Sequence, residues 1–552
     1  MADPDRLTNE QREKTKKYSI IDGAAYSVMF GFGEQYVVPF AIRLGATNSQ
    51  IGILSSVPSF IGSLFQILGA KLTDQWRSRK KIVTFFVFFQ ALTLLPLFII
   101  PFLTKSVTVL TIIFMFYMIF ANIVGPAWGS WMGDIVKEGE RAKYFSKRNK
   151  TIVTSMMISV LAAGIILHTF DNINIWIGFG ILFSVAFIGR IISTLYLSKQ
   201  LEPKYIPPQS ETFSLREFLH RMPHSNFGNF ALYRSLMAFS VMIASPFFVV
   251  YVLKTLQFSY IQYTAIVLVP MLVKVLTMTY WGKYSERFGS KRIMTVSGMV
   301  IAIIPLLWFI FGLLFENTHL IFYLILLAEA ISGFAWAGFE LTTFNYMLET
   351  ASPQKRAKAF AYFNVMFGTM VLFGGLIGSW LVSWIPPILG IGTLLIVFLI
   401  SFIIRSVIAM RFAGRMKEVR IEKNVDENKL FFDLVIAKPW NGALHQTTSM
   451  ITLAEKGIIV ISDKTKDTVE TIAEPVLPVI KKIVDFLDKV FDMLEPLRKS
   501  IEPEIVKKHK REMYKHLTEI DNEGYLHIIP KEKKEEKKED NRTKRQRRVK
   551  GI

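Results

Sequence analysis

Five ionisable residues lie inside long apolar stretches of the chain, where a charged group needs either an oppositely charged partner or a functional role. They are Glu34, Arg190, Lys274, Glu329 and Glu340. An ionisable group near the middle of a bilayer costs about 2.5–3.5 kcal/mol on insertion scales. A carboxylate in such a place can take up and release a proton, because desolvation favours its neutral form.

Glu329 and Glu340 stand eleven residues apart, which is three helical turns with about 20° of drift, so one helix face carries both. Trp336 lies on that face between them. Two interpretations stay open. Either a carboxylate is protonated and released in a working cycle, or Lys274 forms a structural ion pair with Glu329 or Glu340. Glu34 is the preferred proton carrier, because Arg190 is the one basic residue of its half that could lie near it.

Chemistry that depends on cysteine or on a metal ion is not expected. The chain has no cysteine, and its eight histidines show no HExxH-type pairing. No glycine-rich nucleotide loop and no nucleophile motif is present. We therefore expect no cofactor, no metal centre and no enzyme activity.

The stretches that hold these charges are long enough to cross a membrane. The 552 residues are 51% hydrophobic and include 46 Phe. Apolar runs of about 20 residues follow one another from Tyr18 to Phe412, and each has the length of a membrane-spanning helix. The period-2 alternation of a membrane β-barrel is absent, so the fold is expected to be all-α. Twelve helices are predicted, at 18–43, 49–72, 81–103, 107–133, 147–170, 172–197, 229–254, 258–284, 291–315, 318–347, 357–383 and 385–412.

Basic residues gather in the even-numbered connections between these predicted helices. The net charge is +21, and the odd-numbered connections carry almost none of it. Lys and Arg collect on the cytoplasmic side of membrane proteins. Both termini are therefore expected to be cytoplasmic, in a multi-pass protein of the plasma membrane. This placement of charge argues against nucleic acid as the partner.

Two charged connections of the first half recur in the second half. LGAKLTDQWRSRK, ending at Lys80, aligns with YWGKYSERFGSKR, ending at Arg292, at an offset of 212 residues. The connections after the fourth and tenth helices align at an offset of 215. The matched positions are Asp74 with Glu286, Asp134 with Glu349, and Arg141 with Arg356. We infer two related halves, residues 1–198 and 229–412, joined by a polar linker at 199–228.

This arrangement resembles the Major Facilitator Superfamily, whose members have six helices, a long cytoplasmic loop and six more helices. Its G-x-x-x-[DE]-R-x-G-x-[KR]-R motif fits the second copy, at Gly282, Glu286, Arg287, Gly289, Lys291 and Arg292. In the first copy, the two glycines and the arginine of the motif are replaced by Ala70, Arg77 and Gln75. The acidic-x6-Arg pairs resemble an element of that superfamily's sugar porters. The further motifs of drug–proton antiporters and of sugar porters are missing, so no subfamily is assigned.

The resemblance implies a central cavity lined by helices 1, 4, 7 and 10. The expected cavity residues are Glu34, Asn122, Lys274, Glu329, Trp336 and Glu340. Asn122 and Asn364 could equally serve helix packing.

The resemblance also implies latches between the two halves at the cytoplasmic face. The matched carboxylates would bond the free N–H groups of a neighbouring helix N-terminus. Arg287 or Arg356 would close over them, and Gly282 would let two helices approach closely. The simpler interpretation is that these charges only fix the topology.

The C-terminal part differs in composition from the rest. Residues 413–530 are predicted to form a small cytoplasmic α/β extension, because strand-like runs and an amphipathic helix pattern follow the last span. Residues 531–552 end in RTKRQRRVK and are expected to be disordered and close to anionic lipid headgroups. Nucleic-acid binding by this tail is the minority interpretation.

These features together predict a secondary active transporter that moves a small solute by alternating access between the two halves. Protons or another ion would drive it. The alternative is a membrane sensor or scaffold that keeps the fold, moves nothing and uses the C-terminal extension as its output domain.

Overall fold

The computed structural model describes residues 7–137, 140–205, 215–351, 356–388 and 390–419, and two short strands further on. The chain divides into two compact units, Met1–Val425 and Asp426–Ile552. The elements of the first unit are helices. In the second unit, the antiparallel strands β1 (Glu519–Ile520) and β2 (Leu526–His527) are described. The strands predicted within 430–462, the amphipathic helix at 476–501 and the basic tail at 531–552 lie outside the described residues.

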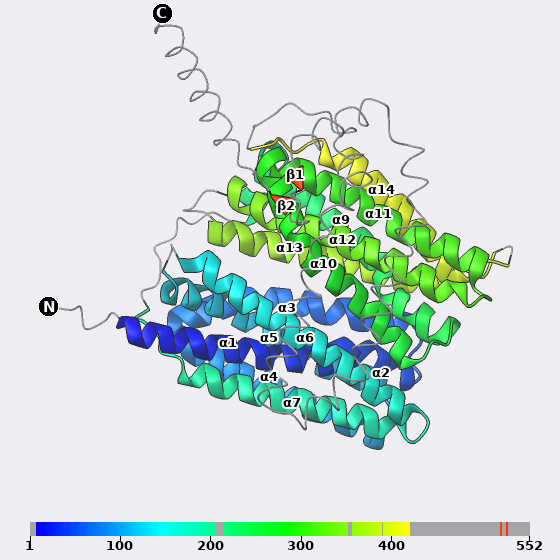
Figure 1. Ribbon diagram of the computed structural model, residues 1–552, viewed down its shortest axis with the longest axis horizontal. Coiled ribbons are helices and arrows are strands. Elements are labelled where there is room, and N and C mark those ends of the chain that lie inside the picture. Colours follow the sequence, from blue (N-terminus) through cyan, green and yellow to red (C-terminus); the bar gives the residue numbers. More distant parts are fainter. Residues whose placement is uncertain are drawn as a thin grey trace, which may run out of the picture. The chain divides into compact units, whose positions relative to one another are not determined.

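The first half contains five long helices after its first membrane segment. They are α3 (Asn48–Trp76), α4 (Arg79–Leu103), α5 (Val107–Ile135), α6 (Arg141–Asp171) and α7 (Ile175–Lys199). Figure 1 shows them lying side by side in blue to blue-green. α3 packs against α5, and α4 packs against both α5 and α7.

The second half begins after the short helices α8 (Leu215–Arg221) and η3 (Met222–His224). Its long helices are α9 (Asn226–Val250) with the π-helical turn η4 (Tyr251–Thr255), α10 (Tyr260–Phe288), α11 (Ser290–Phe315), α12 (Leu320–Thr350), α13 (Arg356–Trp384) and α14 (Thr393–Ala413). In the described part of the chain, eleven helices are long and apolar enough to cross a membrane. They correspond to the second to twelfth helices predicted from the sequence.

The first membrane segment is interrupted, whereas one continuous helix was predicted over 18–43. It consists of α1 (Asn9–Phe32), the 3-10 turn η1 (Glu34–Tyr36) and α2 (Val37–Arg43). Pro39 has no N–H to bond the carbonyl of Gln35. That carbonyl instead accepts a hydrogen bond, at 3.4 Å, from the Tyr263 hydroxyl of α10. The break therefore gives the first half a backbone acceptor for the second half, and it places Glu34 at the interruption.

Equivalent helices of the two halves begin and end alike. Thr47 caps α3 and Ser259 caps α10, 212 residues later, each in a capping box with a glutamine three residues on. The same helices end at Arg77, with φ +49°, and at Gly289, with φ +90°. Arg77 thus occupies a left-handed position at the site where the second copy has glycine. The repeat found in the charged connections extends to the helix ends.

Helices of the two halves meet directly at α3 with α13 and at α6 with α10. Small residues make these contacts close. A Cβ added at Gly375 would overlap Ser56, and one added at Gly164 would overlap Thr264. In a membrane, where lipid tails are as apolar as leucine, small residues at such crossings let the helix backbones approach.

Two clusters of buried apolar residues are found in the described part of the chain. The larger one draws on both halves and includes Phe40, Phe247 and Trp308. The other lies in the first half around Ile82 and Trp131. Since the larger cluster joins the halves, their contact is part of the core in this structure.

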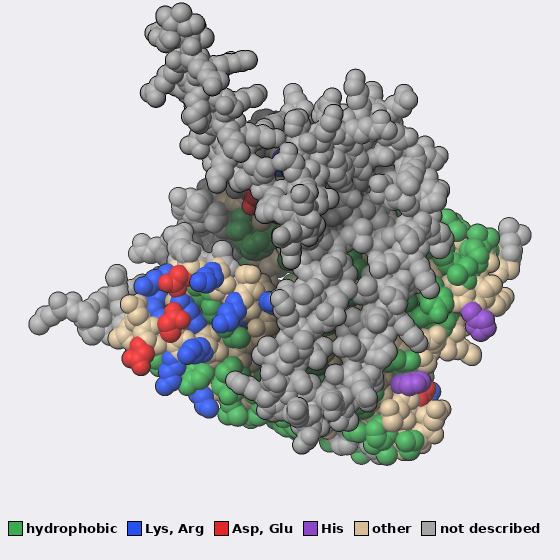
Figure 2. All heavy atoms as spheres, in the orientation of Figure 1, with side chains coloured by type: hydrophobic (Ala, Val, Ile, Leu, Met, Phe, Trp, Pro, Cys, Tyr) green, Lys and Arg blue, Asp and Glu red, His purple; other side chains and the backbone are tan. Residues whose placement is uncertain are grey.

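We call the end of the bundle that carries the start of α1 and the α3–α4, α5–α6 and α10–α11 connections the basic end. Figure 2 shows Lys and Arg side chains, with fewer Asp and Glu, gathered at this end of the first half. The other end, where α2 meets α3 and α6 meets α7, is called the opposite end.

The contact between the halves can be tested by cross-linking, because the chain has no native cysteine. Asn364 of α13 donates a hydrogen bond to Gln66 of α3 at 2.8 Å. We expect the double variant Gln66→Cys with Asn364→Cys to be joined efficiently by a short bifunctional thiol reagent. Pairing Gln66→Cys with Ile158→Cys, a position 63% exposed on α6, is the control. Equal yields for both pairs, measured by gel shift after proteolysis between the halves, would contradict this packing.

Candidate functional site

Lys274 of α10 and Glu340 of α12 form an ion pair in the middle of the second half. Their side chains are 33% and 46% exposed, although both residues lie well inside their helices. Charged side chains at such depth face the bundle interior or a water-filled cavity rather than lipid. Trp336, one turn before Glu340, packs edge-on against Phe339 with ring centroids 5.8 Å apart. The structure thus pairs Lys274 with Glu340, one of its two predicted partners, and Trp336 lies one helical turn away on α12.

Glu329 lies about 16 Å from Glu340 along α12, given a rise of 1.5 Å per residue. Its carboxylate accepts a hydrogen bond from the Trp308 indole N–H of α11 at 3.2 Å. Glu329 therefore faces α11, whereas Glu340 is paired with α10. The two carboxylates share a helix but not a site.

Glu34 sits at the break between α1 and α2. Its carboxylate accepts a hydrogen bond from the Tyr117 hydroxyl of α5 at 2.7 Å. Within the described residues it has no ion pair, and Arg190, the cation considered near it, is engaged elsewhere. Glu34 is thus half-buried beside a neutral donor, a setting that suits a carboxylic acid better than a permanent anion.

Asn122 and Asn364 have different surroundings. The Asn122 amide donates to the Met118 carbonyl one turn back on α5, at 2.9 Å, and it is the group that a Cβ at Gly62 would meet. It therefore packs α5 against α3. Asn364 makes the bond to Gln66 that joins the halves.

A buried polar cluster in the first half was only partly foreseen. Asp22 of α1 pairs with Arg148 of α6 at 3.6 Å and accepts a hydrogen bond from Ser193 of α7 at 2.6 Å. Arg190 of α7 donates to Ser193 and to Gln90 of α4. Asp22 and Arg148 lie near the ends of their apolar runs, which is why sequence reasoning did not count them as membrane charges.

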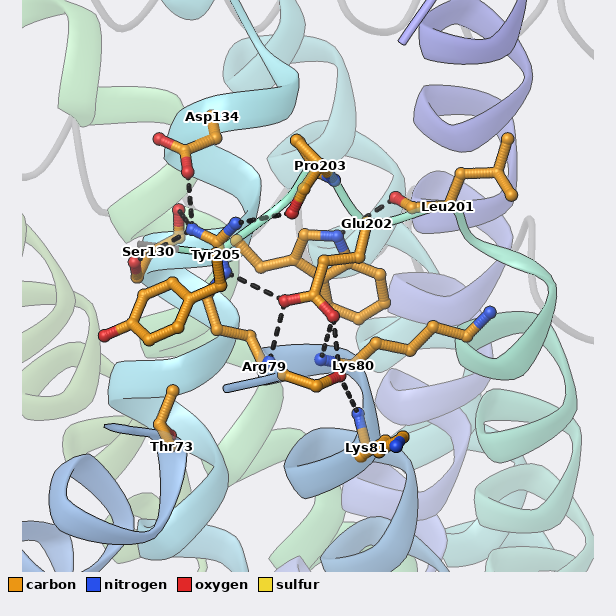
Figure 3. Close-up of polar contacts among 12 residues, drawn as sticks. Thr73, Arg79, Lys80, Lys81, Ser130, Asp134, Leu201, Glu202, Pro203 and Tyr205 are labelled. Atoms are coloured by element: carbon orange, nitrogen blue, oxygen red, sulfur yellow. Dashed lines mark hydrogen bonds and ion pairs between the residues drawn. The ribbon is translucent and has the colours of Figure 1, made fainter. Parts of the chain in front are cut away.

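Arg79 is the centre of a second network, at the basic end (Figure 3). Its side chain is 1% exposed and contacts Glu202 at 3.1 Å and Asp134 at 2.5 Å. Glu202 follows α7 and also accepts the backbone N–H groups of Arg79 and Lys80 at 2.7 and 3.2 Å. A carboxylate at a helix N-terminus satisfies free donors and complements the helix dipole. Glu202 therefore fastens the end of α7 to the start of α4.

The second half contains the same arrangement. Glu418, after α14, accepts the backbone N–H groups of Lys291 and Arg292 at 3.4 and 3.1 Å, at the start of α11. Glu202 and Glu418 are 216 residues apart. Glu418 also occupies the space that a Cβ at Gly289 would need, so a side chain there would displace it. This is a physical reason for glycine at that position of the motif.

The residue before each capping glutamate is held by hydrogen bonds to its own backbone N–H and carbonyl groups. Leu201 donates its N–H to Thr15 of α1 at 3.2 Å and accepts the indole N–H of Trp131 of α5 at 3.1 Å. Lys417 donates to Asn226 of α9 and accepts the hydroxyl of Tyr346 of α12, both at 2.8 Å. We call each set of bonds, together with its glutamate, a clip. Each clip ties the first, third, fourth and sixth membrane segments of one half together.

The described contacts of the predicted latch residues Asp74, Asp134 and Glu349 lie within one half. Asp74 accepts a hydrogen bond from the Tyr205 hydroxyl at 2.6 Å, and burial, followed by this bond, raises the pKa of Tyr205 above its usual range. Glu349 accepts from Ser290 at 3.2 Å. Asp134 pairs with Arg79 rather than reaching the second half. The predicted bonding of a helix N-terminus by a carboxylate does occur, but Glu202 and Glu418 perform it.

The motif between α10 and α11 is more open than predicted. Glu286 and Arg287 are exposed, and Arg287 lies over the ring of the adjacent Phe288. Gly282 is not a close-approach position, because the nearest atom to an added Cβ is Leu341 Cδ2 at 4.0 Å. The side chains of Arg141 and Arg356 lie outside the described residues.

The family model of the Major Facilitator Superfamily matches residues 23–226 and 230–440. The chain belongs to the Major Facilitator Superfamily. The match covers both halves, so the resemblance drawn from the two charged connections is confirmed, and the fold is that of membrane transporters. No curated protein matches the sequence.

Solved structures of this superfamily share the fold at low identity. A mutant of the nucleoside transporter NupG superposes with a TM-score of 0.60 and 15% identity, covering 73% of this chain and 100% of that one. The POT family transporter PepTSo gives 0.58 and 10%, covering 74% and 98%. A bacterial homologue of the iron transporter ferroportin gives 0.53 and 12%, covering 74% and 100%.

Removing a clip carboxylate should destabilise the protein. We expect Glu202→Gln to lower the free energy of unfolding by about 1.5–3 kcal/mol, the usual contribution of a hydrogen bond to a charged group. Glu418→Gln should lower the free energy of unfolding by less than Glu202→Gln does, because Glu202 also contacts the Arg79 side chain. Glu286→Gln, at an exposed carboxylate, is the matched control and should change stability by less than about 0.5 kcal/mol. Thermal unfolding of purified protein in detergent gives the ranking, and an equal effect of all three variants would refute it.

Proposed function

We propose that this protein is a secondary active transporter that moves a small solute by alternating access. The observation that carries the proposal is where the two halves touch. Near the opposite end, Tyr36 bonds Thr264 at 3.0 Å, and Lys254 donates to the Ala46 carbonyl at 2.5 Å. At the basic end, the described bonds of Asp74, Arg79 and Asp134 stay within the first half. The described bonds between the halves therefore reach from the opposite end as far as Gln66 and Asn364. Beyond them, the described bonds at the basic end stay within one half, as we expect of a transporter that opens at that end.

In this proposal the basic end faces the cytoplasm of a plasma-membrane protein, with both termini on that side, because Lys and Arg concentrate there. The structure then corresponds to an inward-facing state with its cytoplasmic latches open. In the outward-facing state, Asp74, Glu286 and Arg356 would engage across the halves. The basic tail at 531–552 would rest on anionic headgroups beside this face.

Transport is tested with purified protein in proteoliposomes. We expect a pH gradient to drive accumulation of one or more solutes from a metabolite mixture, read by mass spectrometry of the vesicle contents. The control is a variant locked by the Gln66→Cys and Asn364→Cys cross-link, which should retain the fold but stop accumulation. If no solute enters under proton, sodium or potassium gradients, and the C-terminal extension recruits a soluble partner instead, the sensor or scaffold function replaces this one.

Glu34 is proposed as the proton-coupling residue. It sits at a helix break with the Tyr117 hydroxyl as its donor, whereas Glu340 is already neutralised by Lys274. A carboxylate that moves between two aqueous sides has to lose and regain its proton without a fixed cation holding its charge.

Glu34→Gln should abolish gradient-driven accumulation and leave solute exchange intact, because the amide mimics the protonated acid. Tyr117→Phe removes only the hydrogen-bond donor and should shift the pH dependence of accumulation without abolishing it. Both are measured by uptake against counterflow in the same vesicles. Accumulation by Glu34→Gln with wild-type pH dependence would move the coupling site to Glu329.

A further inference from the structure

Among the described residues, Arg234, two turns inside α9, is a cation without an ion-pair partner. Its half-buried guanidinium makes no hydrogen bond or ion pair in the described part of the chain. It lies over two aromatic rings, Phe339 of α12 at 5.3 Å and Phe367 of α13 at 4.7 Å. Other buried arginines of the helices have acceptors. Arg148 and Arg190 contact polar side chains. Arg405 donates through its two Nη groups to the carbonyls of Ile301 and Val241, although its Nε has no partner among the described residues.

Ring contacts do not replace the missing acceptors. A guanidinium has five N–H donors and stays charged at every physiological pH. A cation–π contact contributes about 0.5–2 kcal/mol. The five N–H groups point outward in the plane of the guanidinium, so a ring stacked on its face accepts no hydrogen bond from them. The guanidinium of Arg234 can therefore form two parallel hydrogen bonds to an oxyanion, in a bidentate contact.

The nearest carboxylate is already committed. Glu340 follows Phe339 directly and is close enough to act electrostatically on Arg234, but its ion pair is with Lys274. Along their helices, Arg234 and Glu340 lie about 12 and about 15 Å from the basic end, at 1.5 Å per residue. Arg234, Lys274 and Glu340 together carry one net positive charge at this depth.

The repeat shows what is missing. The clip pairs Thr15 with Asn226, an offset of 211, which aligns Asp22 with Tyr233 and Gly23 with Arg234. In the first half, an arginine lies against Gly23 and is neutralised by Asp22. In the second half, the arginine is on α9 itself, and a tyrosine stands where the acid would be. The second half therefore has an arginine here, Arg234, but no acidic residue that corresponds to Asp22.

We propose that Arg234 binds the oxyanion group of an organic solute, either a carboxylate or a phosphate. Phe339 and Phe367 lie against the guanidinium, and Trp336 packs edge-on against Phe339. These aromatic rings suit a flat, apolar body attached to the oxyanion. This inference rests on the proposed transport function, since it names the class of solute carried. It assigns the second half, rather than the Glu34 region, as the place where solute charge is recognised.

Binding can be measured without transport. The probes are benzoate, phenyl phosphate, benzamide and benzylamine, which share a ring and differ in the charge of their head group. We expect benzoate or phenyl phosphate to raise the unfolding temperature of the wild-type protein in detergent, and the stronger of the two identifies the oxyanion. Benzamide and benzylamine should not. Stabilisation by the neutral or cationic probe, or by no probe, would overturn the proposal.

The variants separate binding from folding. Arg234→Gln should weaken binding of the anion at least about tenfold, because a hydrogen bond to a charged group is lost. Arg234→Lys keeps the positive charge but loses the bidentate guanidinium. It should fold normally and bind the anion with intermediate affinity. Glu340→Gln should bind the anion as tightly as wild type or more tightly, because it removes a negative charge. If Arg234→Gln retains wild-type affinity, or Glu340→Gln loses binding as Arg234→Gln does, the cluster is structural.

The site and the transport function can fail separately. Anion-dependent stabilisation with no solute uptake in proteoliposomes would keep the site and refute the transporter. Uptake restricted to neutral or cationic solutes, unchanged in Arg234→Gln, would keep the transporter and refute the site.

Discussion

The constraint behind this structure is that a bilayer supplies neither hydrogen bonds nor counter-ions, so the protein has to provide both internally. Helices satisfy most backbone groups by themselves, and two exceptions show how other groups are satisfied. Pro39 frees the carbonyl of Gln35, and Tyr263 of the other half binds it. Arg405 is held by two carbonyls from neighbouring helices. Where such an answer is missing among the described residues, as at Arg234, the gap itself is informative.

The two clips show how one solution serves both halves while the side chains differ. Thr15 and Asn226 are different acceptors, and Trp131 and Tyr346 are different donors, but each bonds the backbone of the residue before the glutamate. Because the partner is main chain, any side chain with the right polarity and reach is suitable. The glutamate is the same in both halves, since it has to neutralise a helix terminus. Each half is thereby fixed as a unit, which the proposed alternating access requires.

The sequence was sufficient for the architecture because hydropathy and the repeat are local patterns. Eleven spans and the superfamily followed from them. It did not predict the break in the first segment, although Gly33 and Pro39 marked it. It also assigned the helix-terminus bonds to Asp74 and Glu286 instead of Glu202 and Glu418. Those glutamates lie more than 120 residues from the helices they cap, and no periodicity connects such distant positions. The proposed roles of Glu34, Glu329 and Glu340 still depend on experiment.

The ends of the bundle differ in what closing them requires. At the opposite end, neutral groups and glycines make most of the contact, as at Gly164, Tyr36 and Thr264. At the basic end, Lys and Arg predominate, and Asp74 and Asp134 are bound within their own half. Approach of the two halves there brings like charges together, which is unfavourable until carboxylates are shared between them. Salt screens that repulsion over about 10 Å at 0.1 M. In the proposed alternating access, closing of the basic end would therefore depend on exchanging carboxylate partners, whereas closing of the opposite end would depend on packing.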